Sequence, residues 1–206
     1  MNPRENLLPD LKSQIRFLNA NTVNFPIDIY INDVLYTSNL DFGKITTYKG
    51  FPPGEYIIDI YKSSDKSTKL FSDEAVFLPN SNLTISIVSS DENISLFILT
   101  DGSKIKSSVN SYLRFINLSP DSHLFSLSNS NDNILFSGVE YLETTNYSSI
   151  TCGIHDFLLS ETNNSEYFKT FIKNLSLSSG TYYTIYIVGV RLGKPLLGYI
   201  FTEDGK

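Results

Sequence analysis

The residues capable of acid, base or nucleophilic chemistry are few and scattered. The run Asp121-Ser122-His123 contains the residue types of a hydrolase triad. Such triads are assembled from distant positions and need a nucleophile turn of the Gly-x-Ser-x-Gly type, which the sequence lacks. The second histidine, His155, has no companions that would complete the three or four ligands of a metal site. We therefore expect no enzyme activity, no bound metal and no cofactor.

Acidic residues and the single cysteine also favour structural roles. The close carboxylate pairs are Asp73 with Glu74, Asp91 with Glu92, Glu140 with Glu143, and Glu203 with Asp204. A glycosidase needs two acids that face each other across about 5 to 10 Å, which neighbours in loops do not imply. We expect all four pairs to be solvated turn charges. Cys152 cannot form an intramolecular disulfide, and we expect it to be a small buried side chain.

Two arginines lie in short segments of similar sequence, Arg16 within 15–19 and Arg114 within 113–117. A guanidinium group at this position could clamp an anionic ligand, because its planar fork matches carboxylates and phosphates. Alternatively, each arginine braces a neighbouring loop through backbone carbonyls or through an acid such as Asp28 or Asp121. Both interpretations remain open, and we favour the bracing role.

Four tyrosines fall on strand positions opposite to the alternating apolar residues that should form the core. They are Tyr30, Tyr61, Tyr182 and Tyr186. Tyrosine suits a contact surface because its rigid ring covers a large area and its hydroxyl is polar. These residues are a candidate partner face, although cross-strand pairing of tyrosines on a solvated face is an equally good interpretation. Some of them should pack between domains.

An internal repeat organises the elements that would position these residues. Several segments return in the same order about 100 residues later, which indicates two copies of one folding unit. The matching segments are 15–19 and 113–117, 34–36 and 134–136, 46–48 and 145–147, 54–61 and 153–160, and 83–88 and 183–188. We divide the chain into an N-terminal segment (1–12), a first repeat (13–101), a linker (102–110) and a second repeat (111–206).

Within each copy, apolar residues alternate with polar ones, as in half-buried strands. Leu83, Ile85 and Ile87 alternate with Thr84 and Ser86, for example. Turn-forming residues separate the strands at short intervals. The pattern predicts an all-β fold of two tandem β-sandwich domains, Ig-like or transthyretin-like, with about seven or eight strands each.

Composition limits the partners. The chain has 16 basic and 22 acidic side chains, which give a net charge of −6, so we expect no nucleic-acid binding. No apolar stretch approaches the roughly 18 to 20 residues needed to span a bilayer, so we expect no membrane insertion. The first ten residues do not resemble a secretory signal, which predicts synthesis in the cytoplasm. Association with a cell surface stays open.

Particular motifs resemble the bacterial family called domain of unknown function 4397. They are the segment 114–122 (Arg-Phe-Ile-Asn-Leu-Ser-Pro-Asp-Ser), its counterpart 16–21 followed by the strand 27–32, Tyr48, the corner 53–56 and the strand 180–185. The resemblance implies tandem β-sandwich modules of secreted or surface-associated bacterial proteins without an assigned activity.

From these observations we expect a non-catalytic structural or adhesive binding module, associated with a bacterial envelope or surface. It would bind a protein partner or associate with itself through sheet edges or faces. A carbohydrate-binding module is the first alternative, although the chain contains no Trp. A hydrolase acting on polysaccharide is the second.

Overall fold

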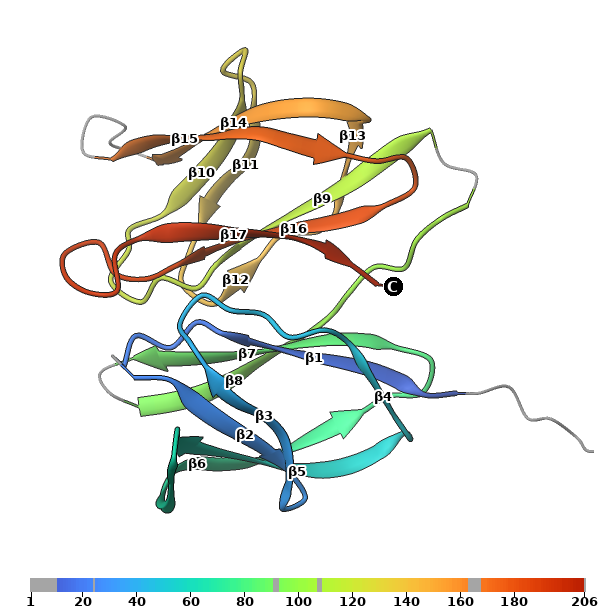
Figure 1. Cartoon of the computed structure of the whole chain (residues 1–206). Helices are drawn as coiled ribbons and strands as arrows, with labels where there is room; N and C mark the ends of the chain where they lie inside the picture. Colours follow the sequence, from blue (N-terminus) through green and yellow to red (C-terminus); the bar gives the residue numbers. More distant parts are fainter. Residues whose placement is uncertain (1–10, 24, 91–92, 107–108, 163–167, 206) are drawn as a thin grey trace, which may run out of the picture.

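The computed structural model describes residues 11–23, 25–90, 93–106, 109–162 and 168–205. The regular structure of these residues is all β, arranged as two sandwiches of eight and nine strands (Figure 1). The all-β prediction is therefore confirmed. None of the described segments forms a helix long and apolar enough to cross a membrane. Most of the N-terminal segment and the acidic pair Asp91 and Glu92 lie outside the described residues.

The first sandwich consists of a sheet of order β4-β1-β7-β8 and a sheet of order β3-β2-β5-β6. Its strands are β1 (Ser13–Asn19), β2 (Ile27–Ile31), β3 (Val34–Leu40), β4 (Lys49–Phe51), β5 (Gly54–Lys62), β6 (Asp65–Phe77), β7 (Asn82–Ser90) and β8 (Asn93–Thr100).

The second sandwich consists of a sheet of order β12-β9-β16-β17, with β13 also paired to β9, and a sheet of order β11-β10-β14-β15. Its strands are β9 (Asn110–Asn117), β10 (Phe125–Asn129), β11 (Ile134–Val139), β12 (Glu143–Thr144), β13 (Ser148–Thr151), β14 (Gly153–Glu161), β15 (Lys169–Leu177), β16 (Tyr182–Val188) and β17 (Gly198–Asp204).

The two sandwiches share their strand order and their registers. In the first sandwich, β1 pairs in parallel with β7, which places Arg16 opposite Thr84. In the second, β9 pairs in parallel with β16, which places Arg114 opposite Thr184. A side-chain contact repeats as well, because Thr46 Oγ1 accepts from the backbone of Phe17 just as Thr145 accepts from that of Phe115. The segments that match in sequence therefore occupy matching positions in space.

Each sandwich has its own apolar core, built from the alternating side chains of its two sheets. In the first, the alternating residues of β2 and β7, such as Ile29 and Ile85, are fully buried. In the second, Leu127 of β10 and Ile185 of β16 take the corresponding places. The alternation in the sequence thus identified the inward-facing residues correctly.

A third apolar cluster lies between the sandwiches. Its buried members are Leu18, Ala20, Val88, Ile116, Leu118, Tyr186 and Val188. These side chains come from the outer faces of the sheets β4-β1-β7-β8 and β12-β9-β16-β17, which face each other (Figure 1). The molecule is consequently a stack of four sheets with three buried layers, and the middle layer joins the two sandwiches.

Candidate functional site

The most elaborate polar arrangement in the described residues is at one side of this middle layer. Arg16 projects from the outer face of β1 and is 3% exposed. Its Nε donates to Thr84 Oγ1 at 2.8 Å on the neighbouring strand. Its Nη1 and Nη2 cross to the second sandwich, where they donate to the backbone oxygen of Glu203 at 2.8 Å and to Asp204 Oδ1 at 2.5 Å.

Arg114 makes the equivalent contacts in the opposite direction. Its Nε donates to Thr184 Oγ1 at 3.1 Å. Its Nη1 and Nη2 cross to the first sandwich and donate to the backbone oxygen of Thr100 at 3.0 Å and to Asp101 Oδ1 at 2.7 Å. Each sandwich therefore supplies one arginine and receives one, as in an isologous interface between two copies of a protein.

The second oxygen of each carboxylate accepts hydrogen bonds from residues of its own sandwich. Asp101 Oδ2 accepts from Thr84 at 2.5 Å and from the hydroxyl of Tyr48 at 2.7 Å. Asp204 Oδ2 accepts in the same way from Thr184 and Tyr147. The tyrosine rings also stack on the guanidinium groups, at 4.4 Å for Tyr48 on Arg16 and 4.6 Å for Tyr147 on Arg114. We call these eight residues the interdomain clasp: Arg16, Tyr48, Thr84, Asp101, Arg114, Tyr147, Thr184 and Asp204.

The charges of the clasp compensate one another within a buried site. Burial lowers the pKa of Arg16, but the Asp101 carboxylate and other neighbours more than offset this, so the net shift is upward. Burial and the Asp101 carboxylate together raise the pKa of Asp204, although the two guanidinium groups lower it. All three guanidinium nitrogens of each arginine have protein partners. The arginines thus brace one sandwich on the other.

Three tyrosines, two half-buried in the clasp and one fully buried in the middle layer, predict a measurable pH dependence. Burial raises the pKa of Tyr48, Tyr147 and Tyr186 above the ordinary value of 10.0, and acidic neighbours add to the effect. These phenols stay neutral in the folded protein but ionise near pH 10 in the unfolded chain. The free energy of unfolding should therefore hold below pH 10 and fall as the pH rises above it.

Spectrophotometric titration of tyrosinate checks this expectation. Tyr48, Tyr147 and Tyr186 should ionise only together with unfolding, and Tyr48→Phe should remove one group from that late step. A single step near pH 10 that includes all 13 tyrosines of a still folded protein would contradict it.

Several sequence-based expectations about acids and cysteine are wrong. Asp204 was expected to be a solvated turn charge, yet it is fully buried because the first sandwich covers the end of β17. Asp28 and Asp121, the expected partners of the arginines, bind elsewhere. Asp28 accepts from the backbone of Asn39, and Asp121 accepts from the backbone of Arg191. Cys152 is exposed rather than buried, because it lies in the short turn before β14.

The four candidate partner-face tyrosines do not share one surface. Tyr186 is fully buried in the middle layer, so it cannot contact a partner. Tyr182 is half-buried and stacks on Tyr112 at 4.5 Å. Tyr30 and Tyr61 form an edge-to-face pair at 5.3 Å on the outer face of the first sandwich, where Lys66 lies over the Tyr30 ring. Tyr182 lies directly opposite Tyr112 on β9, and Tyr30 lies diagonally from Tyr61 on β5, so both are cross-strand tyrosine pairs.

The histidines stay apart. His123 is exposed, whereas His155 is half-buried, stacks on Phe157 and contacts the backbone oxygen of Thr151 at 2.8 Å. Within the described residues, no group of three or more His, Cys, Asp or Glu side chains is arranged to hold a metal ion.

Gly205, which follows Asp204 of the clasp, packs directly on the backbone of Gly102, which follows Asp101. Gly205 has φ of +60°, and a Cβ atom there would lie 1.9 Å from the backbone oxygen of Gly102. We expect Gly205→Ala to lower the free energy of unfolding by at least about 2 kcal/mol. Gly43, with φ of +75° and no atom within 4 Å of its Cβ position, is the matched control. Gly43→Ala should cost only about 1 kcal/mol in urea unfolding, and equal losses would contradict the close-contact argument.

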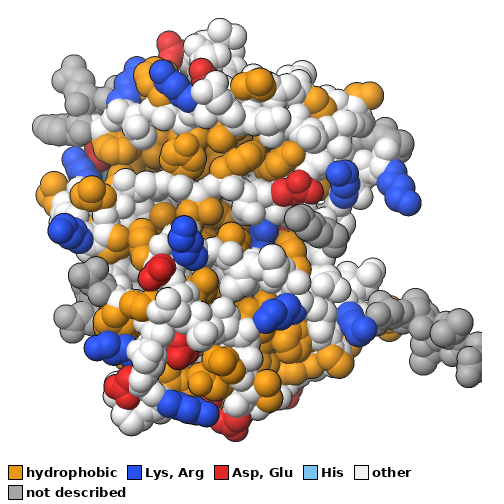
Figure 2. Space-filling view, in the orientation of Figure 1, with side chains coloured by type: hydrophobic (Ala, Val, Ile, Leu, Met, Phe, Trp, Pro, Cys, Tyr) orange, Lys and Arg blue, Asp and Glu red, His pale blue; other side chains and the backbone are white. Residues whose placement is uncertain are grey.

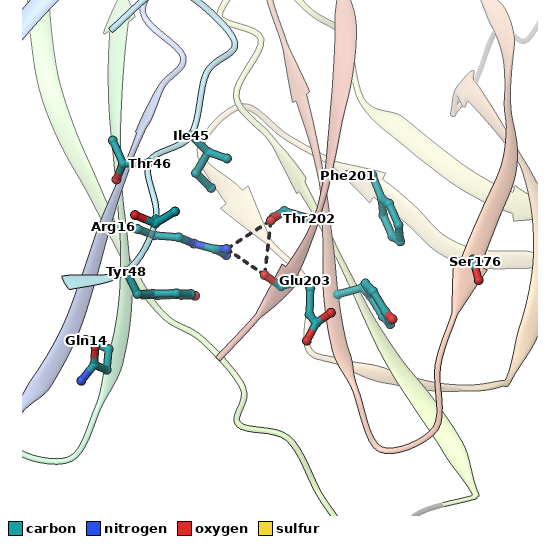
Figure 3. A pocket seen from close by; sticks show the side chains of 11 residues that line it. Gln14, Arg16, Ile45, Thr46, Tyr48, Ser176, Phe201, Thr202 and Glu203 are labelled. Carbon is teal, nitrogen blue, oxygen red and sulfur yellow. Dashed lines mark hydrogen bonds between the residues drawn. The ribbon is translucent and has the colours of Figure 1, made fainter. Parts of the chain in front are cut away.

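An open groove of about 670 Å³ lies beside the clasp. In Figure 3, Gln14, Arg16 and Tyr48 occupy one wall, and Phe201, Thr202 and Glu203 occupy the other. Further lining residues are Ile45, Thr46, Thr47, Ser176 and Tyr183. The Tyr183 and Phe201 rings stack at 5.1 Å. The groove therefore combines ring surfaces, hydroxyl groups and one carboxylate.

Sequence reasoning missed six of the eight clasp residues. Two signals could have identified some of them. Thr84 and Thr184 are aligned within the repeat, as are Tyr48 and Tyr147. The dipeptides Asp101-Gly102 and Asp204-Gly205 also recur near the ends of the two copies.

Comparisons with known proteins give a family and distant structural likenesses. No curated protein matches the sequence. The crystal structure of a candidate adhesin from Bacteroides ovatus aligns with 96% of this chain and 97% of its own, at 9% sequence identity and a TM-score of 0.19. The family model described as "Domain of unknown function (DUF4397)" matches residues 13–128, which span the first sandwich and continue through β9 into β10. This match covers more than half of the sequence, and the chain therefore belongs to the DUF4397 family.

Proposed function

We propose that this chain is a non-catalytic structural or adhesive binding module, associated with a bacterial envelope or surface, whose two sandwiches act as one rigid body. The interdomain clasp is the observation that carries the proposal. Arg16 and Arg114, the side chains best suited to bind an anionic ligand, are used to fix one sandwich to the other. A rigid spacer benefits from this arrangement, because it presents its outer surfaces at fixed positions.

The outer surfaces support the same proposal. Large apolar side chains are exposed on both sandwiches, among them Val34 at 70% and Ile154 at 73%. Figure 2 shows the hydrophobic side chains of one face in separate bands, with basic and acidic side chains between them. Burial of such side chains against another molecule would remove apolar area from water and stabilise the contact.

Crosslinking in bacteria that produce the chain natively, followed by cell fractionation, tests the proposal. We expect recovery in the envelope fraction, in a fixed stoichiometry with itself or with one protein partner. Arg114→Met, which breaks the clasp, should reduce the amount of crosslinked complex. Lys104→Met, at an exposed residue of the linker, should leave that amount unchanged. A cytosolic monomer that turns over a metabolite would refute the proposal.

Carbohydrate binding is the second candidate, and the groove is the observation that favours it. Sugars stack on aromatic rings and bond to hydroxyl and carboxylate groups, and the groove offers Tyr48, Phe201 and Glu203. A glycan array probed with the whole chain tests this candidate. Binding that Glu203→Gln abolishes would support it, and no binding to any glycan would remove it.

A further inference from the structure

The loop between β16 and β17 breaks the symmetry of the two sandwiches. In the second sandwich, residues 189–197 separate these strands, whereas only residues 91–92 separate β7 from β8 at the equivalent place. Figure 1 shows the loop projecting at the end of β17 that is opposite to the C-terminus. The loop is therefore an addition to the repeated fold.

Hydrogen bonds and an ion pair tie this loop to the second sandwich. The Asp121 carboxylate accepts from the backbone of Arg191 at 2.8 Å and of Leu192 at 3.3 Å. Val190 closes the loop across its base, with its backbone bonded to Pro195 and Leu197 at 2.9 Å. Arg191 also lies 3.1 Å from the buried Glu161 carboxylate. A loop fixed in this way loses little entropy on binding a partner.

The tip of the loop exposes apolar and basic side chains. Leu192 is 89% exposed and Leu196 is 72% exposed, and the exposed Lys194 lies between them. The described residues provide no ion pair for the Lys194 ammonium group. Burying such leucines in the sandwich would stabilise the fold, so their presentation on a fixed tip points to a contact with another molecule.

The interdomain groove has complementary chemistry. Its walls offer the apolar surfaces of Ile45 and Phe201, and the carboxylate of Glu203 has no ion-pair partner in the described part of the chain. The positive charge of Arg16 is already compensated within the clasp. The uncompensated charge of the groove is therefore negative, and the groove favours an apolar segment that carries a cation.

We propose that the β16–β17 loop of one copy of this chain occupies the interdomain groove of the next. Lys194 pairs with Glu203, while Leu192 and Leu196 pack against Ile45 and Phe201. Loop and groove lie at opposite ends of β17, so the contact is heterologous and repeats head to tail into linear chains. This inference deepens the proposed structural function and depends on it.

Light scattering and sedimentation of the whole chain from about 1 μM to 1 mM test the proposal, because a small contact of this kind is weak. We expect the average mass to increase with concentration. Lys194→Glu alone and Glu203→Lys alone should each weaken association about tenfold. An equimolar mixture of the two variants should associate again, because each loop then faces a groove of opposite charge.

Leu192→Ser with Leu196→Ser should abolish the association, whereas Ile154→Ser, at an exposed apolar residue elsewhere, should leave it unchanged. A chain that stays monomeric, a mixture that does not associate, or greater sensitivity to Ile154→Ser would each overturn the loop-in-groove contact. Binding of a glycan in the groove that depends on Glu203 would overturn it as well. None of these outcomes refutes a structural role, which fails only if the chain is a cytosolic enzyme.

Discussion

Replacing Arg114 with methionine is expected to lower the free energy of unfolding by about 3 to 5 kcal/mol, because the buried carboxylates of Asp101 and Asp204 then share one arginine, Arg16. Methionine is apolar and flexible enough to occupy much of the vacated space, so the loss reports mainly the missing charge. Urea unfolding of the whole chain, monitored by circular dichroism, measures the change.

Two further variants separate the clasp from a general effect of removing a positive charge. Lys104→Met removes an exposed charge in the linker that connects the sandwiches, and it should change the free energy of unfolding by less than about 0.5 kcal/mol. Asp101→Asn in the Arg114→Met background removes the excess negative charge, so that Arg16 faces only the Asp204 carboxylate, but it keeps an acceptor for Tyr48 and Thr84. The double variant should recover at least about 1 kcal/mol relative to Arg114→Met. Equal losses for Arg114→Met and Lys104→Met would show that the clasp does not stabilise the fold.

The fold was predictable because its signals are local. Alternation along β7 identifies Leu83, Ile85 and Ile87 as inward-facing whatever covers them, and the same three positions recur in β16. Short strands with frequent turns then leave few architectures other than a sandwich.

The clasp was not predictable from the same signals, because the arginine of each repeat binds the aspartate of the other repeat. Arg16 binds Asp204 near the far end of the sequence, while Asp101, the acid at the end of the first repeat, binds Arg114. Reasoning within one repeat pointed to Asp28 and Asp121, which serve nearby loops instead. An internal repeat shows that two units are alike, but it does not show that their outer faces meet.

The tyrosines illustrate the same limit. Tyr30 and Tyr186 both lie opposite to the core phase of their strands, but Tyr30 reaches the surface and Tyr186 is covered by the other sandwich. Alternation identifies the face of a sheet on which a side chain lies, and the packing of the sheets decides whether that face meets solvent.

Tyr186 is also the residue whose truncation should damage the middle layer most. It is the largest of the fully buried side chains, and it lies between the two sandwiches rather than within either core. Tyr186→Ala should lower the free energy of unfolding by about 3 to 5 kcal/mol, because the cavity has a rigid sheet on each side and cannot collapse. Calorimetry should also resolve two transitions in place of one, because the cores of the two sandwiches are left intact.

Tyr186→Phe is the matched control, because it keeps the ring and removes only the hydroxyl group. The Tyr186 hydroxyl has no hydrogen-bond partner among the described residues, so its removal should leave the free energy of unfolding within about 1 kcal/mol or increase it. If Tyr186→Phe were as damaging as Tyr186→Ala, the hydroxyl group rather than the ring would join the sandwiches. If Tyr186→Ala kept a single transition of unchanged midpoint, the middle layer would contribute nothing, and the clasp alone would hold the two sandwiches as one body.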